Sequence, residues 1–328
     1  LIAAEGYSQQ GQESLYFLEI NDNNIINEFV YNEGGNELDP FAILEIENDI
    51  LIGGFVKNRE LISNSFYNMY SEKQMIYIGR FTKFGKKIWS RAIDLNGYEN
   101  GICNSMIKSG NFYFLLCHAN RLEKSMTPFI LKIDSLGQIV KIIELDNNNI
   151  TTIGSLIINN SDVIELHGSY TSNDKNYLYK MMLSLDLDLI NVFEYQIPNN
   201  FIINGINNSN DLFGGILEEG GGFNNCIISP DIDGYLLKKF GSEKSDLIFG
   251  INSNLIFSYT IGSSVEQTST INIFSKEFNS ESVFLHEVNS KLNINSEITF
   301  KYIDNFLKSS INKGVGKVKI SEVKINSK

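Results

Sequence analysis

Histidines are the first residues to consider, because imidazole is the commonest metal ligand and a frequent general base in proteins. The chain has three: His118, His167 and His286. His118 and His167 are 49 residues apart, which is close to one period of the repeat described below, so they could occupy related positions and approach each other. A zinc site needs further ligands at a defined spacing, and the sequence marks none. We therefore expect ordinary hydrogen-bonded imidazoles, no bound metal and no Ser-His-Asp arrangement.

The three cysteines, Cys103, Cys117 and Cys226, include no pair with the CxxC spacing of a metal knuckle or a redox motif. Cys117 adjoins His118, but neighbouring residues of a strand point to opposite faces, which argues against a nucleophile and its base. Buried thiols that act as small hydrophobic side chains are the simpler interpretation. The sequence thus predicts no catalytic residue among its histidines and cysteines.

Two other segments have part of the composition of a ligand-binding loop. The segment DIDGY at 231–235 lacks the alternating oxygen ligands and the final glutamate of a calcium loop, so we expect a turn. The segment EGGGF at 219–223 lacks the lysine of a phosphate loop, and its adjacent glutamates would repel phosphate. We expect no cofactor at either segment.

The formal net charge of -12 argues against a nucleic-acid partner, because phosphate binding needs a clustered basic face and the body of the chain has none. Residues 301–328 are the exception, with seven lysines against Asp304 and Glu322. Lysines protect exposed strand edges, so a solvated edge is the first interpretation and a docking surface is the alternative. No apolar run reaches the roughly 18 residues that span a bilayer, so no transmembrane segment is expected. The chain begins at Leu1 without a signal peptide, which suggests a mature product or a fragment.

Residues 42–93 show the clearest pattern of secondary structure. Short apolar runs at 42–47, 50–55, 75–81 and 87–93 are separated by turn residues, which is typical of antiparallel strands. Gly85 would supply the positive φ that the tight turn of the second hairpin requires. Four strands in about fifty residues form a sheet that is hydrophobic on both faces, so it must stack on copies of itself.

The same four-strand pattern recurs along the chain. The turn between the third and fourth strands has an Asp or Asn three residues before a Gly or Asn, as at 134–137, and weaker copies follow at 186–189, 231–234 and 277–280. A period of about fifty residues with four strands per unit predicts an all-β protein, a single β-propeller domain whose blades are four-stranded and antiparallel. We expect seven blades, with six as the alternative. The expected blades are 1–31, 42–95, 101–146, 151–197, 201–241 and 246–288, and the tail 289–328 is a closing or partial blade.

The turn FTKFGKKIWS resembles the D-x-x-G-x-x-x-W turn of quinoprotein-like propellers, with Gly85 and Trp89 in place and Thr82 where that pattern has Asp. The double glycines at 53–54 and 214–215 are similar to those of kelch blades. The chain thus resembles propellers in general over nearly all of its length. Because Trp89 is the only tryptophan, the resemblance implies neither the ring of tryptophan contacts of quinoprotein dehydrogenases nor a quinone cofactor.

The insertion at 57–74 carries the strongest functional signal, because it lengthens one repeat and is rich in large apolar residues. Their spacing gathers them on one face of an expected short helix. A long loop that projects from a propeller face more often binds than packs, although this one could fold back onto the rim. The expected partner-binding residues are Leu61, Ile62, Phe66, Tyr67, Met69 and Tyr70.

These patterns favour a non-catalytic propeller that serves as a protein-binding scaffold or accessory subunit of a larger assembly. The Asn- and Ile-rich composition resembles propellers of envelope and secreted proteins of Bacteroidota-type bacteria, some of which are subunits of outer-membrane or secretion assemblies. That resemblance implies the cell envelope, periplasmic or outer-membrane associated, or secretion, with a cytoplasmic location as the alternative. The alternative function is a carbohydrate-binding or glycoside-hydrolysing propeller, which would set two carboxylates and aromatic platforms at the mouth of its channel.

Overall fold

The structure is a computed structural model of the whole chain, and the account below concerns the residues whose placement it defines. These are 2–7, 13–21, 24–32, 37–57, 74–120, 126–146, 155–158, 162–172, 174–199, 201–206, 211–217, 223–231, 234–240, 246–251, 255–260, 270–275, 281–285, 287–288, 293–295, 298, 300–302 and 310–312. No helix in these ranges is long and apolar enough to cross a membrane.

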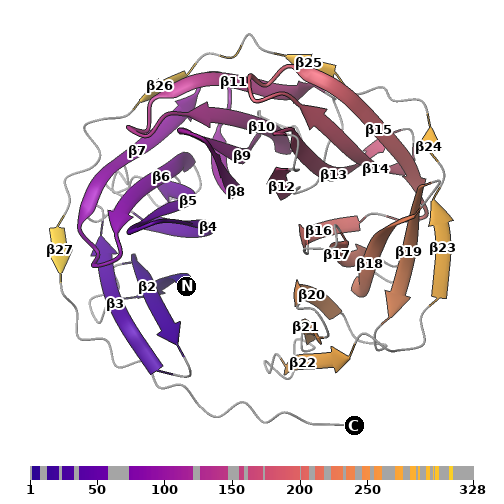
Figure 1. Cartoon of the computed structure of the whole chain (residues 1–328), viewed down its shortest axis with the longest axis horizontal. Helices are drawn as coiled ribbons and strands as arrows, with labels where there is room; N and C mark the ends of the chain where they lie inside the picture. The colour runs from indigo at the N-terminus through magenta and orange to yellow at the C-terminus, as the bar shows by residue number, and fades with distance from the viewer. Residues whose placement is uncertain are drawn as a thin grey trace, which may run out of the picture.

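Six antiparallel sheets, which we number I to VI in chain order, stand around a common axis in the described part of the chain (Figure 1). The first three sheets begin nearest the N-terminus. Sheet I contains β1 (Ile2–Tyr7), β2 (Glu13–Asn21) and β3 (Asn24–Asn32). Sheet II contains β4 (Glu37–Ile46), β5 (Asp49–Lys57), β6 (Gln74–Thr82) and β7 (Lys87–Leu95). Sheet III contains β8 (Asn100–Ser109), β9 (Phe112–Asn120), β10 (Met126–Ile133) and β11 (Ile139–Asp146).

The remaining three sheets continue the ring in the same direction. Sheet IV contains β12 (Ser155–Ile158), β13 (Ile164–Ser172), β14 (Lys175–Leu183) and β15 (Leu189–Ile197). Sheet V contains β16 (Phe201–Ile206), β17 (Leu212–Leu217), β18 (Phe223–Asp231) and β19 (Gly234–Phe240). Sheet VI contains β20 (Asp246–Ile251), β21 (Leu255–Thr260) and β22 (Thr270–Ser275).

Each of sheets II to V pairs four consecutive strands in order, with the first strand nearest the axis and the fourth at the rim (Figure 1). This confirms the prediction of an all-β propeller with four-stranded antiparallel blades. Sheets I and VI show three consecutive strands each in the described residues. Among the described strands of sheet I, β1 pairs with β2 and forms the edge of the sheet.

The strands predicted within 42–93 are confirmed, because they are the four strands of sheet II with slightly wider bounds. Gly85 has a φ of 82°, as its place in the hairpin requires, and Gly137 has a φ of 77° in the equivalent turn. The next turn was assigned two residues too late: the residue of positive φ is Leu187, at 59°, in a turn that begins at Ser184. The turn has a leucine where the other two have glycine, so the sequence did not mark the residue of positive φ, and the turn was predicted too far along the chain.

Neighbouring sheets are joined by apolar seams, which is why the second strands are buried along both faces. β5 and β9 are buried at every position except their ends. Each seam contains buried apolar side chains from both of its sheets. Examples are Phe17 and Tyr77 between sheets I and II, and Ile76 and Leu115 between sheets II and III. Sheets III and IV, and sheets IV and V, are joined in the same way. Burial on both faces removes the alternating pattern that a one-sided sheet would show.

The described part of the chain beyond 280 forms a belt that runs around the rim against the chain order of the sheets (Figure 1). Each belt strand pairs antiparallel with the outermost strand of a different sheet, from sheet V back to sheet I. The belt strands and their partners are β23 (Glu281–Leu285) on β19, β24 (Glu287–Val288) on β15, β25 (Asn293–Asn295) on β11, β26 (Phe300–Tyr302) on β7 and β27 (Ser310–Asn312) on β3.

The belt differs from the arrangement expected for the tail. We expected 246–288 to be one blade and 289–328 to be a closing or partial blade, but β23 and β24 lie on sheets V and IV, and β25 to β27 lie on three further sheets. The physical reason is that every fourth strand offers an open row of backbone donors and acceptors, which an extended segment can pair with. The belt also fills seams, since Leu285 is buried between sheets IV and V and Ile298 packs between sheets II and III.

Candidate functional site

The turns between the third and fourth strands of sheets II, III and IV share one backbone geometry. In each, the residue of positive φ donates its N–H to the carbonyl three residues earlier, which closes a tight turn. These three turns, with the first residues of the fourth strands that follow them, are called the turn row below. The donor and acceptor pairs are Gly85 to Thr82 at 2.9 Å, Gly137 to Asp134 at 3.0 Å and Leu187 to Ser184 at 2.9 Å.

The first side chain of each turn fixes the turn by accepting backbone N–H groups. Asp134 Oδ1 accepts the N–H of Leu136 at 2.9 Å and that of Gln138 at 2.8 Å. Ser184 Oγ and Thr82 Oγ1 play the same part in the neighbouring turns. Short polar side chains stabilise turns in this way, so the polar residue used to trace the repeat has a structural role.

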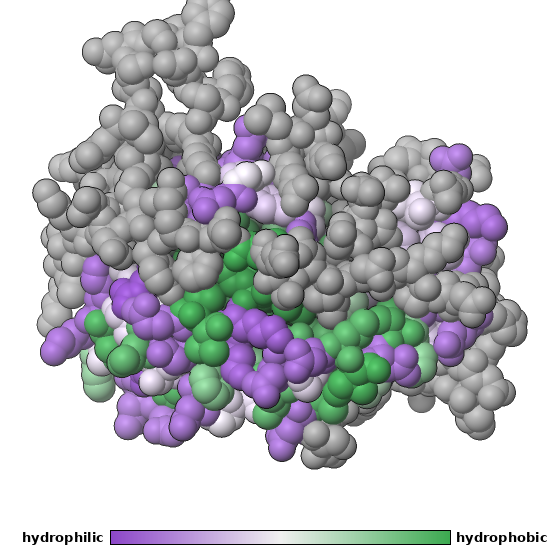
Figure 2. Space-filling view, turned by 90° about the horizontal axis from the view of Figure 1, so that it is seen from above, coloured by the Kyte–Doolittle hydropathy of each residue, from purple (hydrophilic) through white to green (hydrophobic). Residues whose placement is uncertain are grey.

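Large apolar side chains are exposed at equivalent places of these turns. Phe84 and Leu136, one residue before the positive φ, are 85% and 65% exposed. Ile88, Val140 and Ile190, three residues after it, are each about half exposed. Figure 2, which views the molecule from the top of Figure 1, shows hydrophobic groups separated by hydrophilic ones on the described surface. Scattered exposed apolar residues are common on protein surfaces. Here the exposure recurs at one register of three adjacent blades.

Side chains of sheet II hold the turn of sheet III in place. Trp89 Nε1 donates to the carbonyl of Ser135 at 3.1 Å, and Arg80 donates to the same carbonyl at 3.2 Å. Arg91 donates to the carbonyl of Leu136, also at 3.2 Å. Gly137 lies against the indole so closely that a Cβ would be 2.8 Å from the Trp89 ring. Trp89 of sheet II therefore makes a direct contact between blades with the turn of sheet III.

Lysines replace the tryptophan and arginine at the next pair of sheets. Lys141, at the position equivalent to Trp89, donates to the carbonyl of Asp186 at 2.6 Å and to the carboxylate of Asp188 at 2.7 Å. Lys132, equivalent to Arg80, donates to the carboxylate of Asp186 at 2.8 Å. Its ammonium lowers the pKa of the Asp186 carboxyl. The turns of sheets III and IV are therefore each held by side chains of the sheet before them and are not independent loops.

In sheets II and III the described belt strands pair only with the halves of the fourth strands that lie far from the turns, whereas in sheet V β23 pairs with nearly all of β19. In sheet II it pairs with Ile93, Asp94 and Leu95, and in sheet III with residues 144–146. No described strand pairs with the outer edge of β7 at 87–92 or of β11 at 139–143. The exposed Ile88 and Val140 stand in these segments, and Phe84 and Leu136 lie in the turns just before them. In sheets II and III the outer strand is therefore covered by the belt at its far end and has exposed apolar residues at the end near the turn.

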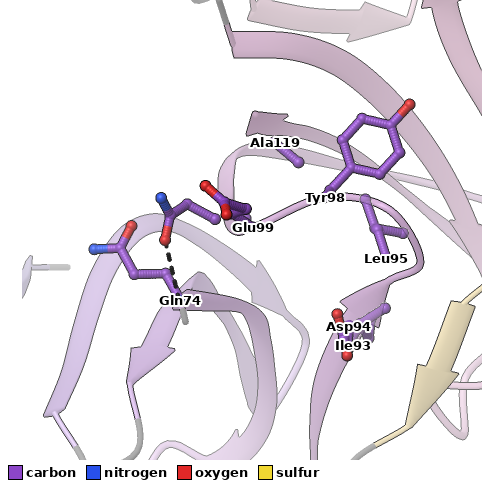
Figure 3. Close-up of a pocket in the computed structure, with 9 residues that line it drawn as sticks. Gln74, Ile93, Asp94, Leu95, Tyr98, Glu99 and Ala119 are labelled. Atoms are coloured by element: carbon purple, nitrogen blue, oxygen red, sulfur yellow. Dashed lines mark hydrogen bonds between the residues drawn. The ribbon is translucent and has the colours of Figure 1, made fainter. Parts of the chain in front are cut away.

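A small recess lies between sheets II and III and is lined by β6, β7, β8, β9 and the β7–β8 loop (Figure 3). Its cavity volume is about 10 Å³ and it opens to solvent, which is room for about one water molecule and far too little for a small organic ligand. Two carboxylates, Asp94 and Glu99, line it. Its aromatic side chain, Tyr98, points its hydroxyl away from the other labelled groups, toward Glu144 Oε1 at 2.5 Å. Size and orientation suit a water molecule better than a sugar ring.

A group of ionisable side chains lies between sheets IV and V. Glu165 and His167 lie on one face of β13, and Lys180 lies opposite His167 on β14. Lys180 Nζ is 3.0 Å from Glu165 Oε1, and His167 Nε2 is 3.5 Å from Glu165 Oε2. His167 is almost fully buried and its ring nitrogens make no hydrogen bond within the described structure. We call these three residues the acid-base cluster.

The environment of the acid-base cluster shifts two pKa values in the same direction. Burial lowers the pKa of His167, although the nearby Glu165 partly opposes this. The pKa of Glu165 is lowered to about 2, first by His167 and then by Lys180. At neutral pH the imidazole is neutral, so the permanent charge pair is Glu165 with Lys180. Enclosure within a seam keeps the cluster from substrate, which favours a structural role.

The structure does not bring His118 and His167 together. Both lie on second strands, as expected from the repeat, but they belong to different seams. His118 shares a face of β9 with the residues that pack against sheet IV, and its Nδ1 is 2.7 Å from Asn104 Oδ1. His167 faces sheet V, like Ser169 two residues later, whose hydroxyl donates to the carbonyl of Phe201. No group of three or more His, Cys, Asp or Glu residues that could hold a metal ion occurs in the described ranges.

The partner-binding residues expected in the insertion lie outside the described residues, which break off between 57 and 74. Their role stays a prediction. They are Leu61, Ile62, Phe66, Tyr67, Met69 and Tyr70. The turn row was missed at the level of sequence, although a signal existed. Phe84 and Leu136 occupy the same register of turns already aligned by Gly85 and Gly137, where an apolar residue is unusual.

No protein-family model and no curated protein matches this chain.

Proposed function

We propose that this chain is a non-catalytic β-propeller that binds a protein partner, as a scaffold or accessory subunit of a larger assembly, and that the turn row is part of its docking surface. The observation that carries the proposal is the repeated exposure of Phe84, Leu136 and the three branched residues at 88, 140 and 190. Exposed aromatic and aliphatic anchors on a rigid support are typical of interface centres. The ties of Trp89 and Lys141 to the next turn supply that rigidity.

Site-specific photo-crosslinking tests the proposal most directly. A photoreactive phenylalanine analogue replaces Phe84 or Leu136 in one set of proteins and the exposed polar residues Lys86 or Gln138 of the same turns in a control set. We expect crosslinks to one protein from the apolar positions and few from the polar ones. Equal crosslinking from all four positions, or none from any, would remove the turn row from the docking surface.

Substitution gives the matching loss-of-function experiment. Phe84→Ser combined with Leu136→Ser is expected to reduce partner recovery at least tenfold, whereas Lys86→Ser combined with Gln138→Ser leaves it unchanged. The insertion is tested in parallel with Phe66→Ser and Tyr70→Ser. If partner recovery depends on the insertion but not on the turn row, the protein is still a scaffold, but the insertion and not the turn row is its docking site.

The finer parts of the proposal concern the setting and the number of blades. We place the protein in the cell envelope or outside the cell, as part of an outer-membrane or secretion assembly, on the resemblance of its composition. Fractionation of the source cells tests this, and recovery in the cytoplasm would contradict it. We also propose six blades, the alternative count, because the described tail strands that were expected to supply a seventh blade form the belt instead. A cryo-EM map that shows a seventh blade would contradict that count.

A further inference from the structure

Two of the three cysteines face each other across neighbouring strands. Cys103 on β8 and Cys117 on β9 are direct partners in the antiparallel register. Both side chains are fully buried in the seam between sheets II and III. Directly opposed residues of an antiparallel pair have Cα atoms about 4.5 or 5.5 Å apart, and disulfides join Cα atoms about 4.4–6.8 Å apart. The backbone is therefore placed for a disulfide without rearrangement of the strands.

The two side chains lie in the same apolar seam. Burial raises the pKa of the Cys117 thiol, and the Cys103 thiol adds to that rise. Space beside them is provided by Gly53 of β5. A Cβ on Gly53 would lie 2.6 Å from Cys103 Sγ and 3.0 Å from Met106 Sδ, so the absence of a side chain there leaves room for the sulfur atoms to turn.

We propose that Cys103 and Cys117 are a redox site that forms a reversible cross-strand disulfide and staples the two strands of sheet III nearest the axis. The reaction is a thiol–disulfide exchange with a small-molecule disulfide such as glutathione disulfide. One cysteine thiolate attacks the disulfide and releases a glutathione thiolate, which leaves a mixed disulfide. The second cysteine thiolate then attacks the protein sulfur of that mixed disulfide and releases the second glutathione. Two electrons pass to glutathione, and the two released thiolates take up the two protons.

Burial determines when this reaction occurs. Neither thiol is accessible in the folded protein, and raising a thiol pKa removes the reactive thiolate. Exchange is therefore slow in the folded protein and fast while the β8–β9 hairpin is still open. Once formed, the bond is enclosed by the seam and resists reduction until the hairpin opens again. The proposal is independent of the docking function, since the turn row and the seam are different surfaces.

Cys226 is a matched control within the same chain. It is equally buried, but across its two neighbouring strands it faces Gly214 and Lys239 rather than a cysteine. The test refolds the full-length protein from denaturant in a glutathione redox buffer, blocks remaining thiols by alkylation, and maps the cysteines by peptide mass spectrometry. We expect a linked peptide pair that contains Cys103 and Cys117 and has lost two hydrogen atoms, with Cys226 alkylated. Alkylation of all three cysteines to the same extent, or linkage of Cys226 to either of the others at similar yield, would overturn the proposal.

A second measurement uses the folded protein and a variant that retains the pair. Oxidised protein is expected to unfold at a midpoint about 2–6 °C above that of reduced protein, because a bond across a loop of about 15 residues restricts the unfolded chain. Cys226→Ser is expected to keep this difference and Cys117→Ser to abolish it. Equal midpoints of oxidised and reduced wild-type protein would contradict a stapling role.

Discussion

The seam between sheets II and III and the seam between sheets IV and V perform the same task with different chemistry. Both bury aromatic and aliphatic side chains from two sheets. The first adds sulfur atoms, Cys103 opposite Cys117, whereas the second adds the acid-base cluster of Glu165, His167 and Lys180. In both seams apolar packing joins the blades. We expect the stability of the first seam to depend on the redox state of its cysteines and that of the second to depend on pH.

The largest expected effect tests the part that the two seams share. Phe129 and Phe201 are fully buried, one in each seam. Phe129→Ala and Phe201→Ala are each expected to lower the free energy of unfolding by about 3–5 kcal/mol, since each removes apolar contacts and leaves a cavity. Denaturant titration measures the change. The exposed Phe84→Ala is the control, with an expected change of about 0.5 kcal/mol or less. If one substitution lowers the free energy of unfolding several times more than the other, the two seams do not share the same apolar packing.

An intermediate effect is expected from the charge pair that only the second seam contains. Lys180→Met leaves the carboxylate of Glu165, which is 8% exposed, without its permanent counter-charge. We expect a loss of about 1–3 kcal/mol, because an unpaired buried charge retains its desolvation cost while the quarter-exposed lysine limits the value of the pair. The double variant Glu165→Leu with Lys180→Met is expected to recover part of the loss. A double variant that is no more stable than Lys180→Met would show that packing, and not charge, is responsible.

The smallest effect, and the one that separates the seams most cleanly, is the response to acid. The pKa of His167 is lower in the folded than in the unfolded protein, so the unfolded chain binds more protons and stability declines as the pH falls below about 6.5. The pKa of Glu165 is lowered to about 2, so its contribution is present above about 4.5 and is lost as the pH falls toward 2.

Thermal unfolding from pH 8 to pH 5 measures the histidine step. His167→Gln is expected to flatten the dependence between pH 7 and pH 5, whereas His118→Gln, on the other side of sheet IV, serves as the control for a buried histidine with a polar partner. If His167→Gln keeps the wild-type slope, another group responds to acid and the acid-base cluster is not the pH-sensitive joint.

The sequence predicted those features that depend on local chemistry. The two hairpins of sheet II, the positive φ of Gly85 and the fifty-residue period all follow from turn residues and short apolar runs, and the structure confirms them. The predicted position of the turn at Ser184 was wrong because Leu187 adopts a positive φ, which a leucine in the sequence does not indicate. The inter-blade contacts of Trp89 and Lys141 were out of reach, because they join residues more than forty positions apart.

The belt could not be predicted for a different reason. Its strands β24, β25 and β26 are two or three residues long, too short for an alternating pattern, and each gains its stability from a partner strand far away in the sequence. The tail was therefore expected to be a closing or partial blade. The candidate docking surface shows the same limit, since exposure of Phe84 and Leu136 is a property of the assembled ring.

The belt also has a consequence for biosynthesis. A ribosome makes about 5–20 residues per second from the N-terminus onward, and domains begin to fold as they emerge. Sheets I to V are complete in sequence before residues 281–312 exist, so their outer strands leave the ribosome as bare edges. Those edges are open to pairing with other nascent chains until the belt is synthesised and closes them in the order V to I. A ribosome that stalls shortly before residue 281 would thus release a chain with nearly all of its blades and every rim uncovered.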